Sequence, residues 1–579
     1  MKIKTFLPLL IILLFSALTS FPLLKVGLHT MHDDQQVARL FLFDEALKAG
    51  QFPPRWVSSL GFGFGYPLFV FYPPLVYFIG EIFHLVGFGF IDSIKIVFFL
   101  SIFLSGISMF ILTRYLFGTI AALVGSAYYI FVPYRALDVY VRGALAESFS
   151  FVWLPLIIYS ILKLTKNPNH YNAILIAVFL TLLMITHNLI FLPFSLILFV
   201  FISQLFTFTK NKKKFVFYSS LAFIYAALLS AFFWMPALAE KKFTIVDNLL
   251  IVNLASYKIH FVYPIQLWNW TWGFGGSTAG ILDGISFKIG KIHILISITS
   301  AIIALLYLKF TNKLKGNSRS IYYFASLIFL LFSLSAFMTT SYSQAIWSSM
   351  KPLAYLQFPW RFLTFTALFS SILAAAIIYM LKLPAFKLPV SIILVLALIL
   401  PNTKLFKPQY YRTNLTDGTA TSYETLSWEV SQSSFEYIPQ GVELIKNEKG
   451  ANSLNISKAE VPYSRVDVTE GAAEIIMLES KPQKLEFTAS ADKSYKIRVN
   501  RFDFPNWEVY INGEKTVYTS DNKFKLITFN VNEGTSQILL KFTNTFTRNA
   551  ANTISAVSFL LLMGYLIRTR WQISRQRSI

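Results

Sequence analysis

The stretch that decides the fold class is residues 189–214, LIFLPFSLILFVFISQLFTFTKNKKK. Its first 21 residues carry no charged side chain, which is enough helix to cross a hydrocarbon core of roughly 30 Å. Four lysines follow within five residues, and such basic residues mark the cytoplasmic end of a membrane helix. This segment therefore predicts both a membrane span and its direction.

The same pattern recurs along all 579 residues, of which 55% are hydrophobic and only 14% charged. A soluble globular chain carries roughly a quarter charged residues, so an ordinary soluble enzyme is excluded. The chain has no cysteine, which excludes a disulfide framework, a thiolate metal site and a cysteine nucleophile. We predict a multi-pass α-helical protein of the plasma membrane with about twelve spans, at residues 5–24, 95–113, 118–133, 147–163, 172–187, 189–209, 215–238, 292–309, 320–338, 361–381, 388–402 and 550–567.

The net charge of +22 reports topology rather than a nucleic-acid partner. Residues 403–548 hold about 18 basic and about 18 acidic residues, so the positive excess lies in the membrane part. With alternating spans, the basic connections fall on one side, the cytoplasm, and about 11 acidic residues outside 403–548 fall on the other. The basic and acidic connections separate in this way only if the apolar stretch 67–90, which prolines interrupt, does not cross the membrane.

Three domains follow from this map. Residues 1–402 form the membrane domain with a large first external loop at 25–94, and a short external loop is expected at 134–146. Residues 403–548 form an external β-sandwich or jelly roll that we expect to fold by itself, because apolar alternation and an Asn512-Gly513 turn predict strands and a hairpin. Residues 549–579 supply a last span and a basic cytoplasmic tail. Trp507 is either a buried core residue of the β domain or a sugar-stacking face.

The first external loop opens with His32-Asp33-Asp34, followed by an amphipathic segment that Gly50 and Pro53-Pro54 terminate. Carboxylates at a helix N-terminus are favoured in their ionised form, which suits a base or a cation ligand. Either aspartate could instead be a helix N-cap. No motif requires a cofactor, and the open alternative is Mg²⁺ or Mn²⁺ held by Asp33 and Asp34.

At these residues the chain resembles the GT-C superfamily of membrane glycosyltransferases. The likeness is greatest to prokaryotic multi-pass proteins labelled 6-pyruvoyl-tetrahydropterin-synthase-related and to YfhO-like proteins. The stretches that carry it are the acidic pair, Pro53-Pro54-Arg55-Trp56, Tyr72-Pro73-Pro74-Leu75, Arg114-Tyr-Leu-Phe-Gly118, Pro133-Tyr134, Val141 to Glu147, Thr186-His187-Asn188 and Leu356 to Phe362.

The resemblance implies an inverting transfer of a sugar from a polyprenyl-phosphate donor to a glycan, lipid or protein acceptor on the outer face. It places the catalytic aspartate at Asp33, with Asp34 as a cap or an auxiliary ligand. The chemistry agrees, since a carboxylate can take the proton of the attacking hydroxyl. Fixed cations stabilise a departing phosphate. The substrate-binding candidates are His32, Arg39, Arg142, Glu147, His187 and Arg361.

Each candidate has a structural alternative. Arg142 and Arg361 could anchor helix ends at the lipid headgroups, and Glu147 could pair with Arg142 and only orient it. His187 could be part of a turn between helices. Tyr134 and Trp360 are expected as aromatic residues of the membrane interface rather than as sugar platforms.

Two other functions remain as alternatives. The first is a transporter or flippase of lipid-linked sugars, although transporters usually carry ionisable residues on broken helices within the membrane. The second is a non-catalytic protein of envelope assembly, whose β domain would do the binding.

Overall fold

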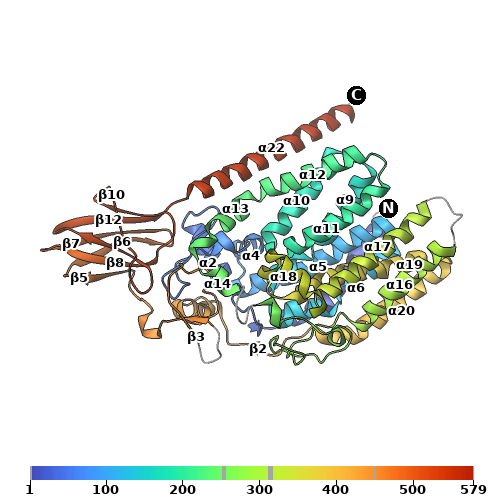
Figure 1. Cartoon of the computed structure of the whole chain (residues 1–579), viewed down its shortest axis with the longest axis horizontal. Coiled ribbons are helices and arrows are strands. Elements are labelled where there is room, and N and C mark those ends of the chain that lie inside the picture. Colours follow the sequence, from blue (N-terminus) through green and yellow to red (C-terminus); the bar gives the residue numbers. More distant parts are fainter. Residues whose placement is uncertain (1–2, 251–255, 311–316, 447–451, 578–579) are drawn as a thin grey trace. The chain divides into compact units, whose positions relative to one another are not determined.

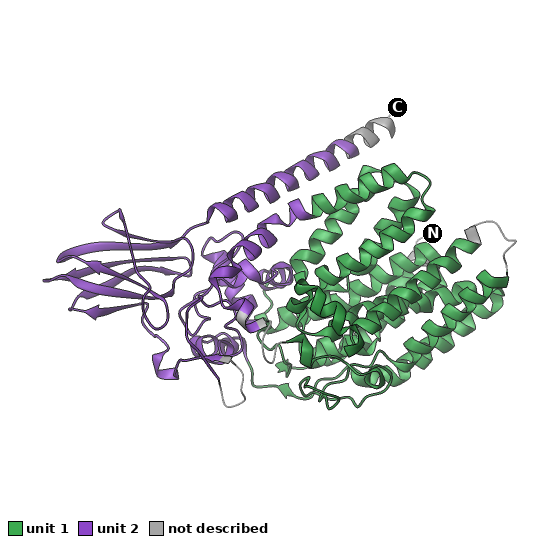
Figure 2. Cartoon of the chain, viewed as in Figure 1, with its two compact units in different colours: residues 1–36, 86–226, 254–415 green, residues 37–85, 227–253, 416–579 purple. Residues whose placement is uncertain are grey.

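The computed structural model describes residues 3–250, 256–310, 317–446 and 452–577, and it is mostly helical with a β-rich C-terminal region (Figure 1). The chain forms two compact units, each built from three separate stretches (Figure 2). Unit 1 contains residues 1–36, 86–226 and 254–415. Unit 2 contains residues 37–85, 227–253 and 416–579.

Unit 1 is a bundle of long apolar helices joined by short helical turns and one two-stranded ribbon. In the ribbon, β1 (Leu28–His29) pairs antiparallel with β2 (Tyr411–Arg412). The helices are α1 (Ile3–Ser20), α5 (Phe90–Phe117), α6 (Thr119–Ile130), α7 (Pro133–Leu137), α8 (Leu145–Ser150), α9 (Trp153–Lys166), α10 (His170–Thr186), α11 (Asn188–Phe208), α12 (Lys212–Leu229), α15 (Pro264–Trp268), α16 (Lys291–Phe310), α17 (Asn317–Met338), α18 (Gln344–Ser349), α19 (Leu363–Met380) and α20 (Pro384–Asn402). Single turns lie at η1 (Phe21–Leu24), η2 (Asp138–Arg142), η5 (Tyr257–Ile259), η6 (Ser341–Ser343), η7 (Lys351–Leu356), η8 (Pro359–Phe362) and η9 (Thr403–Leu405).

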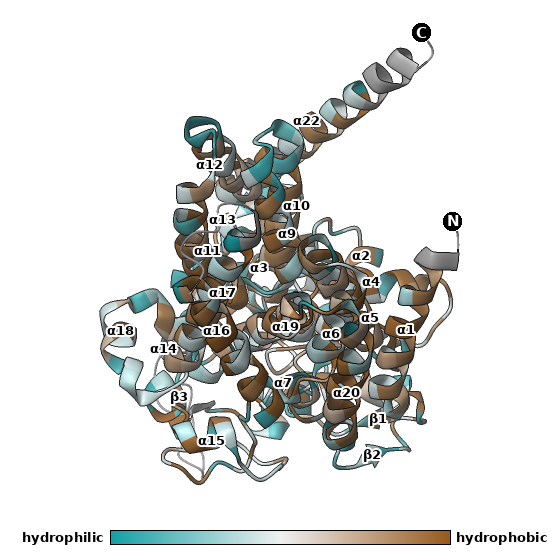
Figure 3. Cartoon of the chain, turned by 90° about the vertical axis from the view of Figure 1, so that its right-hand side faces the viewer, coloured by the Kyte–Doolittle hydropathy of each residue, from teal (hydrophilic) through white to brown (hydrophobic). Residues whose placement is uncertain are grey.

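The centre of unit 1 is α19, which is buried along its whole length except at Tyr379. It packs against α6, α16 and α17, and α5 in turn packs against α6 and α9. The outer helix α20 instead exposes large apolar side chains such as Ile393 and Leu400. Figure 3 shows hydrophobic residues along α11, α16 and α20. Such exposed apolar faces are stable where lipid replaces water.

The described residues contain nine helices long and apolar enough to span a membrane. Two further pairs qualify if each bent pair is one span: Thr119–Ile130 with Pro133–Arg142, and Lys212–Leu229 with Ala231–Phe243. The shorter apolar helix α10 coincides with the remaining predicted span at 172–187. The multi-pass helical architecture is therefore confirmed.

Unit 2 contains the predicted C-terminal β region, and the expected strands are present. One sheet has the order β10-β9-β12-β7-β6, a second has the order β11-β8-β5, and β3 and β4 form a two-stranded sheet, with antiparallel neighbours throughout. The hairpin turn at Asn512-Gly513 is confirmed, since both residues have positive φ, as this turn type requires. The strands are β3 (Leu444–Lys446), β4 (Asn452–Leu454), β5 (Val466–Glu470), β6 (Glu474–Lys481), β7 (Lys484–Ala491), β8 (Tyr495–Phe502), β9 (Trp507–Ile511), β10 (Glu514–Thr516), β11 (Leu526–Val531) and β12 (Gly534–Phe542).

The core of unit 2 also takes in part of the first external loop. Trp56 is fully buried and meets Trp507 edge to face, with ring centroids 5.2 Å apart. Phe64 packs on Phe502, whose backbone N–H donates to the Phe64 carbonyl. Residues 403–415 belong instead to unit 1. The compact unit therefore differs from the predicted 403–548 domain, because apolar residues of the first loop complete its core.

The helices of unit 2 lie before and after these sheets. The apolar helix α4 has only 11 residues, about half the length that a span requires. The helices are α2 (Gln36–Lys48), α3 (Leu68–Phe71), α4 (Leu75–Leu85), α13 (Ala231–Glu240), α14 (Val246–Leu250), α21 (Asp417–Ala420) and α22 (Phe546–Arg577), with turns at η3 (Lys241–Phe243), η10 (Thr425–Val430) and η11 (Lys458–Glu460).

Candidate functional site

The acidic pair of the first loop is fixed by backbone hydrogen bonds to a second segment of unit 1. The N–H groups of His32 and Asp33 donate to the carbonyls of Val141 and Arg142, at 3.0 and 2.7 Å. Gly143 follows with φ +66°, and a side chain there would collide with Met31. The two segments can approach so closely because Gly143 has no Cβ. Asp33 is thereby held beside the chain that carries Arg142.

The two aspartates have different surroundings. Asp33 is exposed, and its carboxylate accepts no hydrogen bond from the described residues. Asp34 forms an ion pair of 3.1 Å with Arg412 on β2. The helix α2 begins only at Gln36, so the pair precedes its first turn. No hydrogen bond of an N-cap from either aspartate is present among the described residues, so Asp33 is a free carboxylate and Asp34 a paired one.

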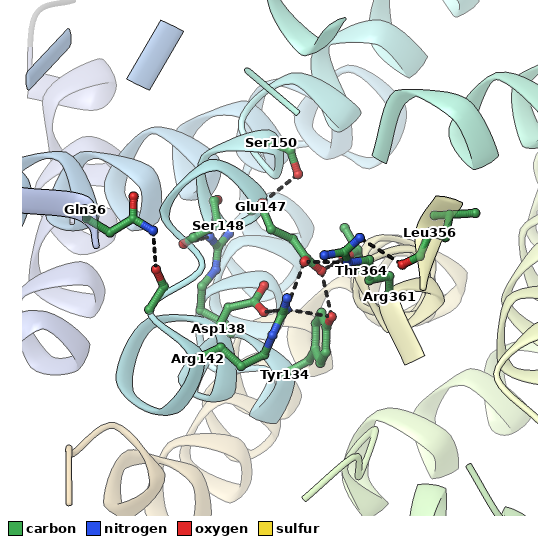
Figure 4. A network of polar contacts seen from close by, with 12 residues as sticks. Gln36, Tyr134, Asp138, Arg142, Glu147, Ser148, Ser150, Leu356, Arg361 and Thr364 are labelled. Carbon is green, nitrogen blue, oxygen red and sulfur yellow. Dashed lines mark hydrogen bonds and ion pairs between the residues drawn. The ribbon is translucent and has the colours of Figure 1, made fainter. Parts of the chain in front are cut away.

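The segment that carries Arg142 also belongs to a buried charged cluster centred on Glu147, at the start of α8 (Figure 4). Its carboxylate accepts hydrogen bonds from Tyr134 at 2.7 Å, Arg142 at 2.8 Å and Thr364 at 3.2 Å. Arg361 approaches it from η8, with Nε 3.6 Å from Oε2. Figure 4 shows both guanidinium groups directed toward this one carboxylate. Three chain segments are therefore joined through a single buried anion.

Arg142 has further partners that fix its position. Its Nη1 donates to Asp138 at 2.5 Å, one helical turn earlier, and its guanidinium lies 4.4 Å from the Trp360 ring centroid. The turn η2 that carries both residues is π-helical, a geometry common at functional sites. Nη2 of Arg142 and Nη2 of Arg361 donate to no described residue. Both arginines therefore keep N–H groups for another acceptor.

The charges of the cluster are divided between a buried part and an exposed part. The buried side chains are those of Arg135, Arg142, Arg361, Asp138 and Glu147, so the buried part has one more positive than negative group. The exposed Asp33 carboxylate is close enough for its charge to act on Arg142 and Arg361, and it offsets that difference.

His187 lies at the junction between α10 and α11 and close to the same cluster. Its Nδ1 accepts the N–H of Ile190 at 3.1 Å, as an N-cap. Because Nδ1 accepts this hydrogen bond, the proton of the neutral ring is on Nε2. His187 is both a helix cap and a hydrogen-bond donor available to a ligand.

The remaining candidates are placed as follows. His32 Nε2 donates to the carbonyl of Phe274 at 3.0 Å, which joins the acidic pair to the loop after α15. Arg39 belongs to unit 2, where its guanidinium lies 4.1 Å from the Tyr72 ring, whereas the other seven candidates are in unit 1. Among the described residues, no group of three or more His, Asp or Glu side chains could hold a metal ion.

Two expectations from the sequence are corrected here, and one alternative is decided. Residues 134–146 are not an open external loop: α7 and η2 occupy most of this stretch and are buried throughout. Tyr134 and Trp360 are not interface aromatics, since both are buried inside the cluster. Trp507 is buried, which confirms the core alternative over the sugar-stacking one. Hydrophobic periodicity failed in the first case because buried ion pairs carry polar residues into a core.

Sequence reasoning missed Asp138, Arg135 and Thr364. The spacing of Asp138 and Arg142 is the i, i+4 spacing of helical ion pairs, and this signal could have identified Asp138. Arg135 is fully buried and donates to Ser148 and Ser105, with its guanidinium 3.8 Å from the Phe151 ring. No sequence signal distinguishes Thr364 from other threonines of apolar helices.

The fold and the site define a multi-pass membrane protein with an exposed carboxylate beside a buried cluster of charged residues. Neither the protein-family models nor the curated proteins include a match to this chain.

Proposed function

We propose that the chain is a GT-C-type glycosyltransferase of the plasma membrane. It would transfer a sugar with inversion from a polyprenyl-phosphate donor to an acceptor hydroxyl on the outer face. The proposal combines the sequence resemblance with one structural observation. A free, exposed carboxylate, Asp33, is fixed by its backbone to the segment that carries one of two arginines with unused N–H groups.

In this mechanism Asp33 is the general base. Its carboxylate takes the proton of the acceptor hydroxyl as that oxygen attacks the anomeric carbon. The bond from the anomeric carbon to the phosphate oxygen breaks, and polyprenyl phosphate leaves with the electron pair. Asp34 is less suited to this role because Arg412 already neutralises it.

Arg142 and Arg361 would bind the phosphate of the donor. Charge-assisted hydrogen bonds from guanidinium groups to phosphate are short, strong and geometrically specific. Glu147 holds both groups in place but accepts only part of their N–H groups. His187, neutral and protonated on Nε2, would supply a further donor to the leaving oxygen.

The test is incubation of the purified protein with a panel of polyprenyl-phosphate sugars and hydroxyl acceptors, with release of polyprenyl phosphate as the readout. Asp33→Asn keeps the size of the side chain and removes the base. It should fold normally and lose transfer by about 100-fold or more, the usual contribution of a positioned base.

Asp34→Asn is the matched control, and it should lose less activity than Asp33→Asn. If the pair holds a divalent cation, both variants fail and a chelator inhibits the parent protein as well. Turnover near the parent rate in Asp33→Asn, with donor and acceptor confirmed, would refute the assignment.

A transporter or flippase of lipid-linked sugars is the second candidate, and one observation favours it. The charged residues of η2 lie on a candidate span that is bent by 41° at a break, an arrangement typical of transporter binding sites. In proteoliposomes, translocation of a lipid-linked sugar that persists in Asp33→Asn and is lost in Arg142→Ala would support this alternative.

A further inference from the structure

The loop from α15 to α16 in unit 1 is held in a defined conformation by hydrogen bonds within it. Its two arms run antiparallel: Phe274 bridges Ile285, and the N–H of Gly275 donates to the Gly284 carbonyl at 2.9 Å. Close approach here needs glycine, because a Cβ on Gly273 would lie 2.2 Å from the Gly284 oxygen. The buried side chain of Gln266 bonds both the Ile281 carbonyl and Asp283. The loop can therefore hold side chains in fixed positions.

Aromatic residues recur at every second position of this loop, at Trp268, Trp270, Trp272 and Phe274. Trp268 is exposed and the other three are half-buried. Among the described residues, no other ring stacks on any of the four, whereas most buried aromatics of the chain pack on another ring. Their rings are therefore not covered by another aromatic ring, and flat apolar faces of this kind accept the C–H face of a sugar ring.

Lysines flank these aromatic faces. Lys288 Nζ lies 5.5 Å from the Trp272 ring centroid, and Lys291 Nζ lies 5.8 Å from that of Trp268. Burial, followed by the charges of Lys404 and Lys291, lowers the pKa of Lys288. Lys404 and Lys291 are therefore both close enough for their charges to repel that of Lys288, an arrangement that an anionic ligand would relieve.

The loop is also connected to the acidic pair, because His32, next to Asp33, donates to the Phe274 carbonyl at 3.0 Å. A chain of sugars that lies along the aromatic residues would therefore end beside the Asp33 carboxylate. That is the place where the acceptor hydroxyl has to be.

We propose that the residues Trp268, Trp272, Phe274, Lys288, Lys291 and Lys404 form a subsite for an anionic glycan, the acceptor of the transfer. This inference rests on the proposed function. Sugar rings stack on the aromatic side chains, and the carboxylates or phosphates of the glycan pair with the lysines. The combination of stacking faces with unpaired cations selects an acidic glycan over a neutral one.

The experiment measures saccharide binding by calorimetry to the purified full-length protein in a neutral detergent. The probes are a galacturonic acid hexasaccharide and, as a neutral comparison, maltohexaose. The acidic hexasaccharide should bind more tightly than maltohexaose, and its affinity should fall as salt is added. Lys288→Gln combined with Lys404→Gln should weaken binding about fivefold or more, and so should Trp272→Ala.

Two exposed residues of the loop at 339–360 provide matched controls. Lys351→Gln and Tyr342→Ala remove an exposed lysine and an exposed aromatic ring that are not among the subsite residues, and both should bind as the parent does. Retention of the fold in every variant is checked by its thermal unfolding temperature.

A lipid headgroup is the competing ligand. The unfolding temperature of the parent and of the lysine variants is therefore also compared in phosphatidylcholine and phosphatidylglycerol nanodiscs. If the variants differ from the parent only in this lipid dependence and bind the hexasaccharide equally well, the lysines bind lipid and the inference is wrong. Equal affinity for maltohexaose also overturns it.

The transfer assay, run in parallel, separates this inference from the proposed function. If the acidic glycan binds and the variants weaken binding as expected, but no sugar is transferred, the glycan subsite is supported and the proposed glycosyltransferase function is rejected. Transfer without acidic-glycan binding rejects this inference alone.

Discussion

Both units bury an arginine against a glutamate, but the two sites differ in how fully their polar groups are satisfied. In unit 2, Glu240 accepts two hydrogen bonds from Arg548, at 2.8 and 3.0 Å, and a third from Thr545. The guanidinium also donates to the Thr543 carbonyl and packs 4.4 Å from the Phe542 ring. The polar groups of this ion pair are therefore satisfied by each other and by their immediate neighbours.

In unit 1 the cluster around Glu147 is incomplete. Asp138 Oδ2 and Trp360 Nε1 are buried without a hydrogen-bond partner, and the arginines keep unused N–H groups. Incomplete satisfaction of a buried polar group costs stability, so it persists where a ligand completes it or where function requires it. The pair in unit 2 is therefore fully hydrogen-bonded, whereas the cluster in unit 1 leaves donors unused, as the proposed phosphate binding requires.

The largest effect is expected for Glu240→Gln, which leaves Arg548 buried without a counter-charge. It should lower the free energy of unfolding by about 3–5 kcal/mol, measured by thermal or denaturant unfolding in detergent. The double variant Glu240→Gln with Arg548→Met should recover most of that loss, because it removes both charges. If the single variant is as stable as the parent, the pair is not structural.

A pH-dependent loss of stability is expected in unit 1 from His29. This residue is buried, its Nε2 donates to the Val139 carbonyl, and burial lowers its pKa to about 4. Between pH 6.5 and 4 the unfolded chain binds a proton that the folded chain does not, so stability falls as the pH falls. The loss should total about 3 kcal/mol across this window and be absent above it. His29→Gln should flatten this part of the pH profile; an unchanged slope would contradict the assignment.

Arg361→Ala tests whether the unit 1 cluster binds the donor phosphate. Loss of a charge-assisted contact, worth about 1.5–3 kcal/mol, should weaken donor binding by about tenfold or more and leave acceptor binding nearly unchanged. Arg361→Lys should recover part of the affinity. The control is Arg412→Ala, since the ion pair of Arg412 with Asp34 is half-exposed and worth at most about 1 kcal/mol. Equal donor affinity in all three variants would make Arg361 a helix anchor.

The smallest effect is expected from single cysteines introduced for topology, which should leave activity unchanged. Because the chain has no cysteine, each variant reports one position. Cysteines at Ser277 in unit 1 and Ser433 in unit 2 should react with an impermeant reagent from outside, and one at Asn211 should not. Labelling of Asn211 in intact cells would overturn the orientation on which the site assignment depends.

The elements that the sequence predicted are those with a local signal. The apolar run 189–209 and the Asn512-Gly513 turn are visible in the sequence because span length and positive φ are local requirements. The pairing of Glu147 with Arg142, which the sequence offered as an alternative, is present too, because the two residues are only five positions apart. Sequence reasoning found Asp33 by its position, but it could not distinguish Asp33 from Asp34.

That distinction depends on Arg412, a residue 378 positions later in the chain that neutralises only Asp34. Other contacts also join residues that are distant in the sequence. Arg361 and Thr364 contact Glu147, more than 200 positions earlier, and Trp56 packs against Trp507 in the core of unit 2. The sequence by itself determined the membrane spans, the strands and the residue types available for chemistry, because these follow from hydrophobic length and backbone preference. The tertiary structure alone decided which charges are paired and which remain free, because ion pairs between distant segments leave no periodic trace in the sequence.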